Sequence, residues 1–121
     1  MRRLPIICIV DDDDDVRSSL KNFLRSAGID VRVFGSAEEF LASDERSGID
    51  CLITDLHMEG MDGLALQEML NGQHRSFPVI VMTAFPTQDT EERSMRLGAA
   101  AYLVKPVDPD MLLDRVERML A

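Results

Sequence analysis

The chain has 121 residues, of which 45% are hydrophobic and 5% aromatic, and its formal net charge is −9 at pH 7. This length suits one domain with a buried core, and the acidic excess argues against non-specific binding to nucleic acid or anionic membranes. No apolar run approaches the ~20 residues of a membrane span, and the apolar core near the start is too short for a signal peptide. We therefore predict a soluble, cytoplasmic protein with a single domain over residues 1–121.

Short runs rich in Ile, Val and Leu alternate along the chain with amphipathic stretches. The runs are typical of strands buried on both faces of a sheet, whereas the stretches repeat their apolar side chains at helical spacing. In chain order, the predicted elements are a strand at 4–10, a helix at 14–27, a strand at 30–34, a helix at 36–42, a strand at 50–54, a helix at 63–70, a strand at 78–82, a helix at 88–97, a strand at 100–104 and a helix at 109–120.

Turn and capping residues mark several of these boundaries. Gly28 ends the first helix, and Asn71–Gly72 is expected to end the third. Ser36 opens the second helix with Glu39 three residues later, which is a capping-box pattern. Pro78 stands first in its strand, where the missing backbone N–H costs no ladder hydrogen bond.

Five strands that alternate with five helices predict an α/β fold. Right-handed crossovers make the sheet parallel and cover it with helices on both faces. For a sheet of this size we expect the flavodoxin-like strand order 2-1-3-4-5, in which ligands bind beyond the carboxyl ends of the strands. Residues directly after each strand are therefore the first candidates for a site.

Charged and polar residues follow four of the five predicted strands. Asp11 and Asp12 follow the first, and Asp55 follows the third. Thr83 comes after the fourth strand and Lys105 after the fifth. Three carboxylates in one cleft raise each other's pKa unless a cation is present, and such hard oxygen ligands suit Mg²⁺. An ammonium and a hydroxyl beside them suit a phosphoryl group.

The run of five aspartates from 11 to 15 is divided between two roles. Asp11 and Asp12 are the metal candidates, whereas Asp13–Asp15 cap the first helix and favour the positive end of its dipole. The alternative is a solvated acidic loop. It accounts for Asp13–Asp15 but not for the recurrence of Asp55 and Lys105 at equivalent strand ends.

Two cysteines, Cys8 and Cys51, lie inside strand-like apolar runs. Buried reduced thiols are the expected state of such a pair in a cytosolic chain. A disulfide or a redox role is the alternative.

Four stretches together resemble a response-regulator receiver domain of the CheY-like kind. They are "VDDD", "TDLHMEGMDG", "VMTA" and "AYLVKP", each at the end of a predicted strand. The resemblance covers essentially the whole chain, with the motifs in the right order and spacing. It implies a two-component signalling protein that is phosphorylated by a sensor histidine kinase, a phosphotransfer protein or a small phosphodonor.

The resemblance also implies roles for individual residues. Asp55 would be the phosphoacceptor and a metal ligand. Asp12 would bind Mg²⁺ directly and Asp11 through water, with Mn²⁺ as a possible substitute. The backbone carbonyl of His57 would be a further ligand.

The same resemblance assigns the remaining site residues. Thr83 would bond a phosphoryl oxygen, and Lys105 would pair with Asp55 or with the phosphoryl group. Tyr102 occupies the aromatic switch position, although a half-exposed strand tyrosine is the plainer interpretation. The Lys105–Pro106 bond is expected to be cis.

Several positions depart from the family pattern or modulate it. Glu59 replaces a usual Pro, so its loop should be more mobile, and its carboxylate either reaches toward the metal or, as we favour, points into solvent. Val107 replaces a common Phe and reduces apolar contact under its loop. His57 and Phe85 flank the phosphoryl position and would influence its lifetime.

The fourth predicted helix, 88–97, has few apolar residues, so we expect weak docking and a two-state element. Phosphorylation could then drive a homodimer through this helix and the fifth strand. "SAEEFL" and "PVIVMTAF" resemble FixJ-type receivers, which are joined to a helix-turn-helix output domain. Because the chain stops after its last helix, it either stands alone or has lost such a domain.

The resulting hypothesis is a phosphoacceptor switch, not an enzyme, although it assists its own phosphorylation and dephosphorylation. One alternative is a pseudo-receiver that binds partners without phosphorylation, for which Glu59 is the only support. A second is a small Mg²⁺-dependent phosphohydrolase, which usually needs a cap segment for which this chain has no room.

Overall fold

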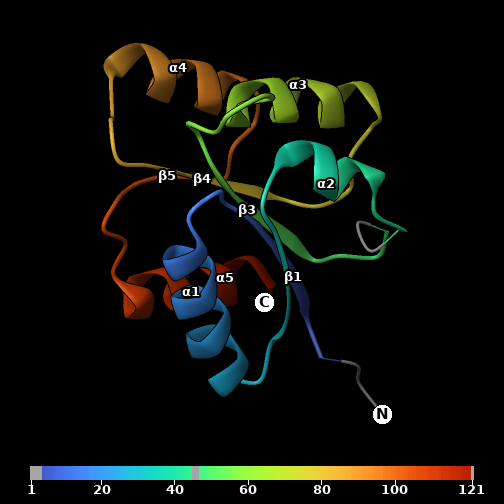
Figure 1. Cartoon of the computed structure of the whole chain (residues 1–121), viewed down its shortest axis with the longest axis vertical. Coiled ribbons are helices and arrows are strands. Elements are labelled where there is room, and N and C mark those ends of the chain that lie inside the picture. Colours follow the sequence, from blue (N-terminus) through green and yellow to red (C-terminus); the bar gives the residue numbers. More distant parts are fainter. Residues whose placement is uncertain (1–3, 45–46, 121) are drawn as a thin grey trace.

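The computed structural model describes residues 4–44 and 47–120. Five parallel strands form one sheet in the order β2-β1-β3-β4-β5, as predicted. Helices α2, α3 and α4 cover one face of the sheet, and α1 and α5 cover the other (Figure 1). The elements are β1 (Ile6–Val10), α1 (Asp14–Ser26), β2 (Asp30–Phe34), α2 (Ala37–Ala42), β3 (Cys51–Asp55), α3 (Gly63–Gly72), β4 (Val79–Thr83), α4 (Gln88–Arg96), β5 (Ala101–Val104) and α5 (Pro109–Leu120).

The sheet separates two apolar cores because successive side chains of a strand point to opposite faces. In β1, Ile7 and Ile9 pack with α1 and α5, whereas Cys8 packs on the face of α2 and α3. Cys51 lies in the core of α1 and α5. Cys8 and Cys51 therefore lie on opposite faces, and both are buried thiols that form no disulfide, as expected.

The helix ends follow the predicted capping chemistry in two places. The Asp13 carboxylate caps α1 by accepting hydrogen bonds from the backbone N–H groups of Asp15 and Val16. The Ser36 hydroxyl accepts from Glu39 N at 3.0 Å, but the Glu39 carboxylate reaches Gly35 N instead of closing a full capping box.

The predicted end of α3 was wrong. Asn71–Gly72 does not stop the helix, which continues through Gly72 and ends at Gln73. The turn is made by His74, which takes a left-handed backbone with φ of 56°. This conformation lets Arg75 N bond the carbonyl of Leu70, which satisfies an open carbonyl at the helix end.

Four of the five strands, β1, β3, β4 and β5, differ from their predicted bounds by one or two residues. Asp55 and Thr83 are the last residues of β3 and β4, not the residues after them, because the ladder continues to their positions. β1 begins at Ile6 because Pro5 has no N–H and contributes only its carbonyl, which accepts from Asp30 N at 2.9 Å. Among the described residues, no helix is long and apolar enough to cross a membrane.

Gly63 lies where α3 starts against the end of β3, and we predict that it tolerates no side chain. A Cβ atom there would stand 2.5 Å from the carbonyl oxygen of Asp55 and 3.0 Å from Leu56 Cα. We expect Gly63→Ala to lower the free energy of unfolding by about 1–3 kcal/mol in urea denaturation.

Gly72 is the matched control because it ends the same helix in open space. Outside its own helix and chain neighbours, no atom of the described residues lies within 4 Å of the place that a Cβ atom would take. Gly72→Ala should raise the free energy of unfolding by about 0.5–1 kcal/mol, since alanine loses less backbone entropy in a helix. A rise in the free energy of unfolding for both changes would show that helix propensity, not contact with Asp55, decides the effect.

Candidate functional site

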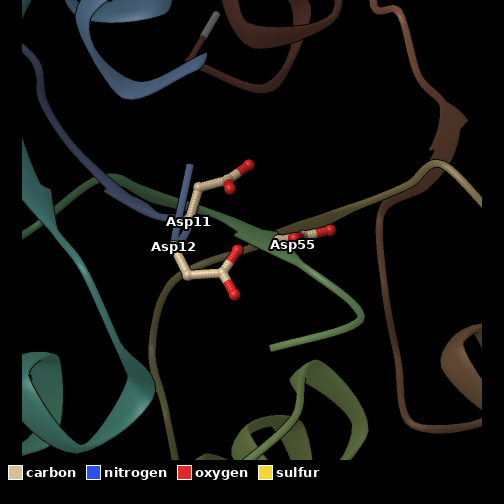
Figure 2. A group of neighbouring side chains, drawn as sticks. All are labelled: Asp11, Asp12 and Asp55. Carbon is tan, nitrogen blue, oxygen red and sulfur yellow. The ribbon is translucent and has the colours of Figure 1, made fainter. Parts of the chain in front are cut away.

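Three carboxylates gather at the carboxyl edge of the two central strands. Val10 of β1 pairs with Thr54 of β3, so Asp11 follows one strand beside the position where Asp55 ends the other. Asp11, Asp12 and Asp55 each present an oxygen atom, and these atoms all lie within 4.8 Å of one another (Figure 2). Hard oxygen donors at this spacing fit a divalent cation such as Mg²⁺.

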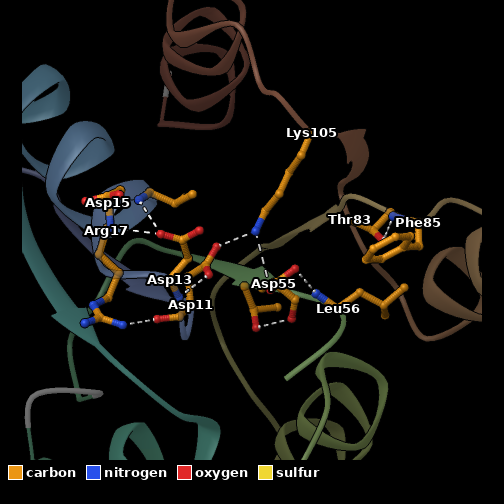
Figure 3. A network of polar contacts seen from close by, with 11 residues as sticks. Asp11, Asp13, Asp15, Arg17, Asp55, Leu56, Thr83, Phe85 and Lys105 are labelled. Carbon is orange, nitrogen blue, oxygen red and sulfur yellow. Dashed lines mark hydrogen bonds and ion pairs between the residues drawn. The ribbon is translucent and has the colours of Figure 1, made fainter. Parts of the chain in front are cut away.

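Lys105 joins two of these carboxylates from the loop after β5. Its Nζ lies 2.8 Å from Asp11 Oδ2 and 3.4 Å from Asp55 Oδ2 (Figure 3). Its backbone N–H bonds the Thr83 carbonyl at 2.8 Å, and the Lys105–Pro106 peptide bond is cis, as expected. The ammonium is therefore fixed at the edge of the sheet, where it offsets part of the acidic charge.

Burial and charge act against each other at this cluster. Burial raises the pKa of Asp55 above its ordinary value, and the neighbouring Asp11 carboxylate raises it further. Lys105 opposes both effects by stabilising the ionised carboxylate. Burial by itself would lower the pKa of Lys105, but its hydrogen bond to Asp11 and the charges of Asp11 and Asp55 raise it overall. The lysine therefore stays protonated beside its two acceptors.

The loop that carries Asp11 is held by a residue that the sequence patterns did not single out. The Arg17 guanidinium donates to the backbone carbonyl of Asp11 and pairs with the exposed Asp14 carboxylate. Asp11 Oδ1 also accepts from Asp13 N at 2.9 Å. A basic residue three positions after Asp14 on a helix was the available signal, since such residues share one helix face.

Asp55 is fixed from its own loop as well as by Lys105. Its Oδ1 accepts from Leu56 N at 2.9 Å, and its side chain is nearly buried, with 8% exposed. Oδ2 is the atom that faces the ammonium. One carboxylate oxygen is thus held by the backbone, and the other lies toward Asp11 and Lys105.

The rim of the site carries Thr83, His57 and Phe85. Thr83 is buried, and its Oγ1 accepts from Phe85 N at 3.0 Å. Phe85 is 71% exposed and packs edge-on to the exposed His57, with ring centroids 5.9 Å apart and an interplanar angle of 70°. His57 and Phe85 lie two residues after Asp55 and Thr83 respectively, so the aromatic pair joins the loops that follow β3 and β4.

Tyr102 and Glu59 lie away from the carboxylates. Tyr102 of β5 is half-buried, and its hydroxyl lies 2.8 Å from Thr90 Oγ1 on α4. Glu59 is exposed, which agrees with the orientation that we favoured. The small Val107 side chain lines a hollow of about 300 Å³ between α1 and the loop of Lys105.

The structure thus brings Asp11, Asp12, Asp55 and Lys105 into one cluster, with His57, Thr83 and Phe85 around it. Their chemical roles, and the ligand role of the His57 carbonyl, stay predictions.

Asp55→Asn should stabilise the protein at neutral pH. Because the pKa of folded Asp55 is raised, its ionised form disfavours folding, and this penalty disappears below the ordinary Asp pKa of about 3.9. Relative to the variant, the native protein therefore loses stability as the pH rises through the raised pKa of Asp55.

We expect a higher melting temperature for Asp55→Asn at pH 7 without divalent cations, and a difference that shrinks toward pH 4. The exposed Asp44 is the control, and Asp44→Asn should change the melting temperature little. A lower melting temperature for Asp55→Asn at pH 7 would contradict the raised pKa.

Asp12→Asn should weaken Mg²⁺ binding by at least about tenfold in isothermal titration calorimetry. Even partners that only orient metal ligands contribute 10–100-fold to affinity, so loss of a direct ligand should cost no less. Asp15→Asn, an exposed member of the same acidic run, should leave the affinity within about twofold. Equal weakening by both changes would indicate diffuse attraction by the acidic run.

Comparison with known proteins shows which family this chain resembles. A family model described as "Response regulator receiver domain" matches residues 7–117. The DNA-binding transcriptional regulator NtrC of Salmonella typhimurium is 38% identical over 116 residues, which cover 96% of this chain and 25% of NtrC. The transcriptional regulatory protein FixJ of Bradyrhizobium diazoefficiens is 34% identical over 111 residues, which cover 92% of this chain and 54% of FixJ.

A solved structure shows the same similarity in three dimensions. The CheY-like response regulator receiver domain protein from Methanospirillum hungatei has a TM-score of 0.91 and 30% identity, over 98% of this chain and 94% of that chain. The chain spans only a quarter to about half the length of the two curated relatives. Since the family model covers almost all of the chain and the fold agrees, the protein belongs to the response-regulator receiver domain family.

Proposed function

We propose that Asp55 accepts a phosphoryl group and that this modification changes the affinity of the domain for a partner or a second copy. The observation that carries the proposal is the position of Asp55. Its carboxylate faces the Lys105 ammonium at 3.4 Å and lies beside Asp11 and Asp12 at the open edge of the sheet. This arrangement supplies a nucleophile, a fixed positive charge and oxygen ligands for a cation.

The transfer step follows from the orientation of the Asp55 carboxylate. Oδ1 is held by Leu56 N, so Oδ2 is the atom free to attack the phosphorus of a phosphohistidine or of acetyl phosphate. A new P–O bond forms as the bond from phosphorus to the imidazole nitrogen, or to the acetate oxygen, breaks. The electron pair of the broken bond leaves with the donor.

The surrounding residues compensate the charge of the transferred group. Lys105 lies within reach of both Asp11 and Asp55, so it can pair with a phosphoryl oxygen when Asp55 Oδ2 is phosphorylated. Bound Mg²⁺, held by Asp11, Asp12 and Asp55 with the expected His57 carbonyl, would neutralise negative charge on the phosphoryl group. Mn²⁺ would suit the same oxygen donors as a substitute.

Thr83 would carry the signal from the phosphoryl group. Its Oγ1 accepts a hydrogen bond from Phe85 N, which leaves the hydroxyl proton available to donate to a phosphoryl oxygen. A shift of Thr83 would alter the contact of β4 with β5, which carries Tyr102. We therefore retain Tyr102 as the switch residue, with His57 and Phe85 as modulators of phosphate lifetime.

The phosphoryl donor and the greater length of the curated relatives indicate which partners to expect. A sensor histidine kinase or a phosphotransfer protein would supply the phosphoryl group, with Mg²⁺ as cofactor. The curated relatives are two to four times as long as the matched segment, which supports an output domain joined to such a receiver. The comparisons include both NtrC and FixJ, so they support the FixJ-type resemblance without separating it from other regulators.

Intact mass spectrometry after incubation with acetyl phosphate tests the proposal. We expect a mass gain of one phosphoryl group that requires Mg²⁺ and is absent in Asp55→Asn. The control is Asp62→Asn, which changes an aspartate that caps α3 away from the carboxylate cluster and should still gain the group. Absence of the gain in the native protein would favour the pseudo-receiver.

A further inference from the structure

Helix α4 is attached to the domain with few apolar contacts. Ser94 is the only buried residue among its nine, all of which the structure describes. Met95 is 46% exposed. Helices usually gain most of their stability from burying an apolar face, so α4 must be held by other contacts.

Helices α4 and α3 lie side by side (Figure 1). Their contact is centred on two polar side chains, Gln67 and Ser94, which we call the seam. Gln67 of α3 and Ser94 are both fully buried, and Gln67 Nε2 donates to the Ser94 carbonyl at 3.2 Å. Gln67 Oε1 and Ser94 Oγ have no hydrogen-bond partner among the described residues. A buried polar atom without a partner loses its hydration without compensation, so this seam holds α4 weakly.

The two ends of α4 are held very differently. At the carboxyl end, Asn71 Nδ2 donates to the Leu97 carbonyl at 2.9 Å, and Arg75 Nη2 donates to the Gly98 carbonyl at 3.0 Å. Arg75 also donates to the Phe77 carbonyl at 2.6 Å, so it is itself fixed. These contacts tie the carboxyl end of α4 to the last turn of α3 and to the segment that follows it.

At the amino end, a side-chain hydrogen bond joins α4 to the sheet. Thr90 Oγ1 and the Tyr102 hydroxyl lie 2.8 Å apart, and either atom can donate. The Thr90 hydroxyl also lies 2.9 Å from Thr87 Oγ1, which caps the helix. Loss of the Thr90–Tyr102 bond would therefore release the first turn of α4 from β5 without destroying its cap.

We propose that α4 is hinged at its carboxyl end by Asn71 and Arg75 and latched at its amino end by the Thr90–Tyr102 hydrogen bond. The unsatisfied Gln67–Ser94 seam keeps the closed position only slightly favoured. The hinge and the latch are properties of the unphosphorylated protein. Their use in signalling rests on the proposed function, since Tyr102 cannot keep its bond to Thr90 and also turn into the core.

Hydrogen exchange of the unphosphorylated protein, read by mass spectrometry, tests the latch. Thr90→Val and Tyr102→Phe each remove the same bond, so each should speed exchange in the first half of α4 several-fold. Thr90→Val also removes the contact of the Thr90 hydroxyl with Thr87 Oγ1, so the double variant should be no faster than Thr90→Val alone. Exchange in residues 94–98 should stay within about twofold, since the hinge contacts are unchanged.

The seam is tested by replacing both polar side chains with apolar ones. The Gln67→Leu and Ser94→Ala double variant removes the two unpaired atoms, so exchange throughout α4 should slow by about tenfold. Ser94→Ala alone is the milder variant, with the same direction expected. Glu91→Gln on the exposed side of α4 is the control and should have no effect.

The expected results separate this proposal from the phosphoacceptor function. Faster exchange at both ends of α4 in Thr90→Val, or unchanged exchange in both seam variants, would overturn the hinge and latch. These measurements use no phosphodonor, so they hold whether or not Asp55 is phosphorylated. With acetyl phosphate and Mg²⁺, the double seam variant should gain the phosphoryl mass but show a smaller change in α4 exchange than the native protein.

Discussion

The arrangement of charges at the carboxyl edge of the sheet depends on the Lys105 ammonium. Parallel pairing of β1 and β3 forces Asp11 and Asp55 together, and Asp12 adds a third carboxylate. Lys105 contacts two of the three, so repulsion is reduced but not removed. The remaining negative charge would favour a cation beside the three carboxylates. The uncompensated charge lowers the stability of the fold at this edge, as the raised pKa of Asp55 indicates.

The helices on the two faces of the sheet differ in how tightly they pack against the strands. On the side of α1 and α5, apolar side chains such as Leu24, Leu112 and Val116 are fully buried and fix the strands. On the other side, α4 adds only the polar Ser94 to the interior. That face has fully buried apolar side chains of its own, such as Phe40, so α4 alone is loosely packed there. A loosely packed helix beside the strand ends would suit a chemical event that is sensed as a change of shape.

The sequence allowed prediction of the features that depend on local pattern. The five strands, the Asp13 cap and the cluster of Asp11, Asp55 and Lys105 follow from apolar runs and from the topology that they imply. The end of α3 was missed because His74 adopts a left-handed backbone that its residue type rarely takes. The roles of Arg17, Thr90 and Gln67 were missed since each depends on a partner brought close only by folding.

The placement of the two cysteines has a practical consequence. Cys8 and Cys51 are both fully buried, on opposite faces of the sheet, and burial raises the pKa of Cys51 to about 12. Thiol reagents react with the exposed thiolate, so neither native cysteine is a good target. A cysteine introduced on the surface of α4 would therefore be labelled selectively in the otherwise native chain, and a single fluorophore or spin label could report on that helix.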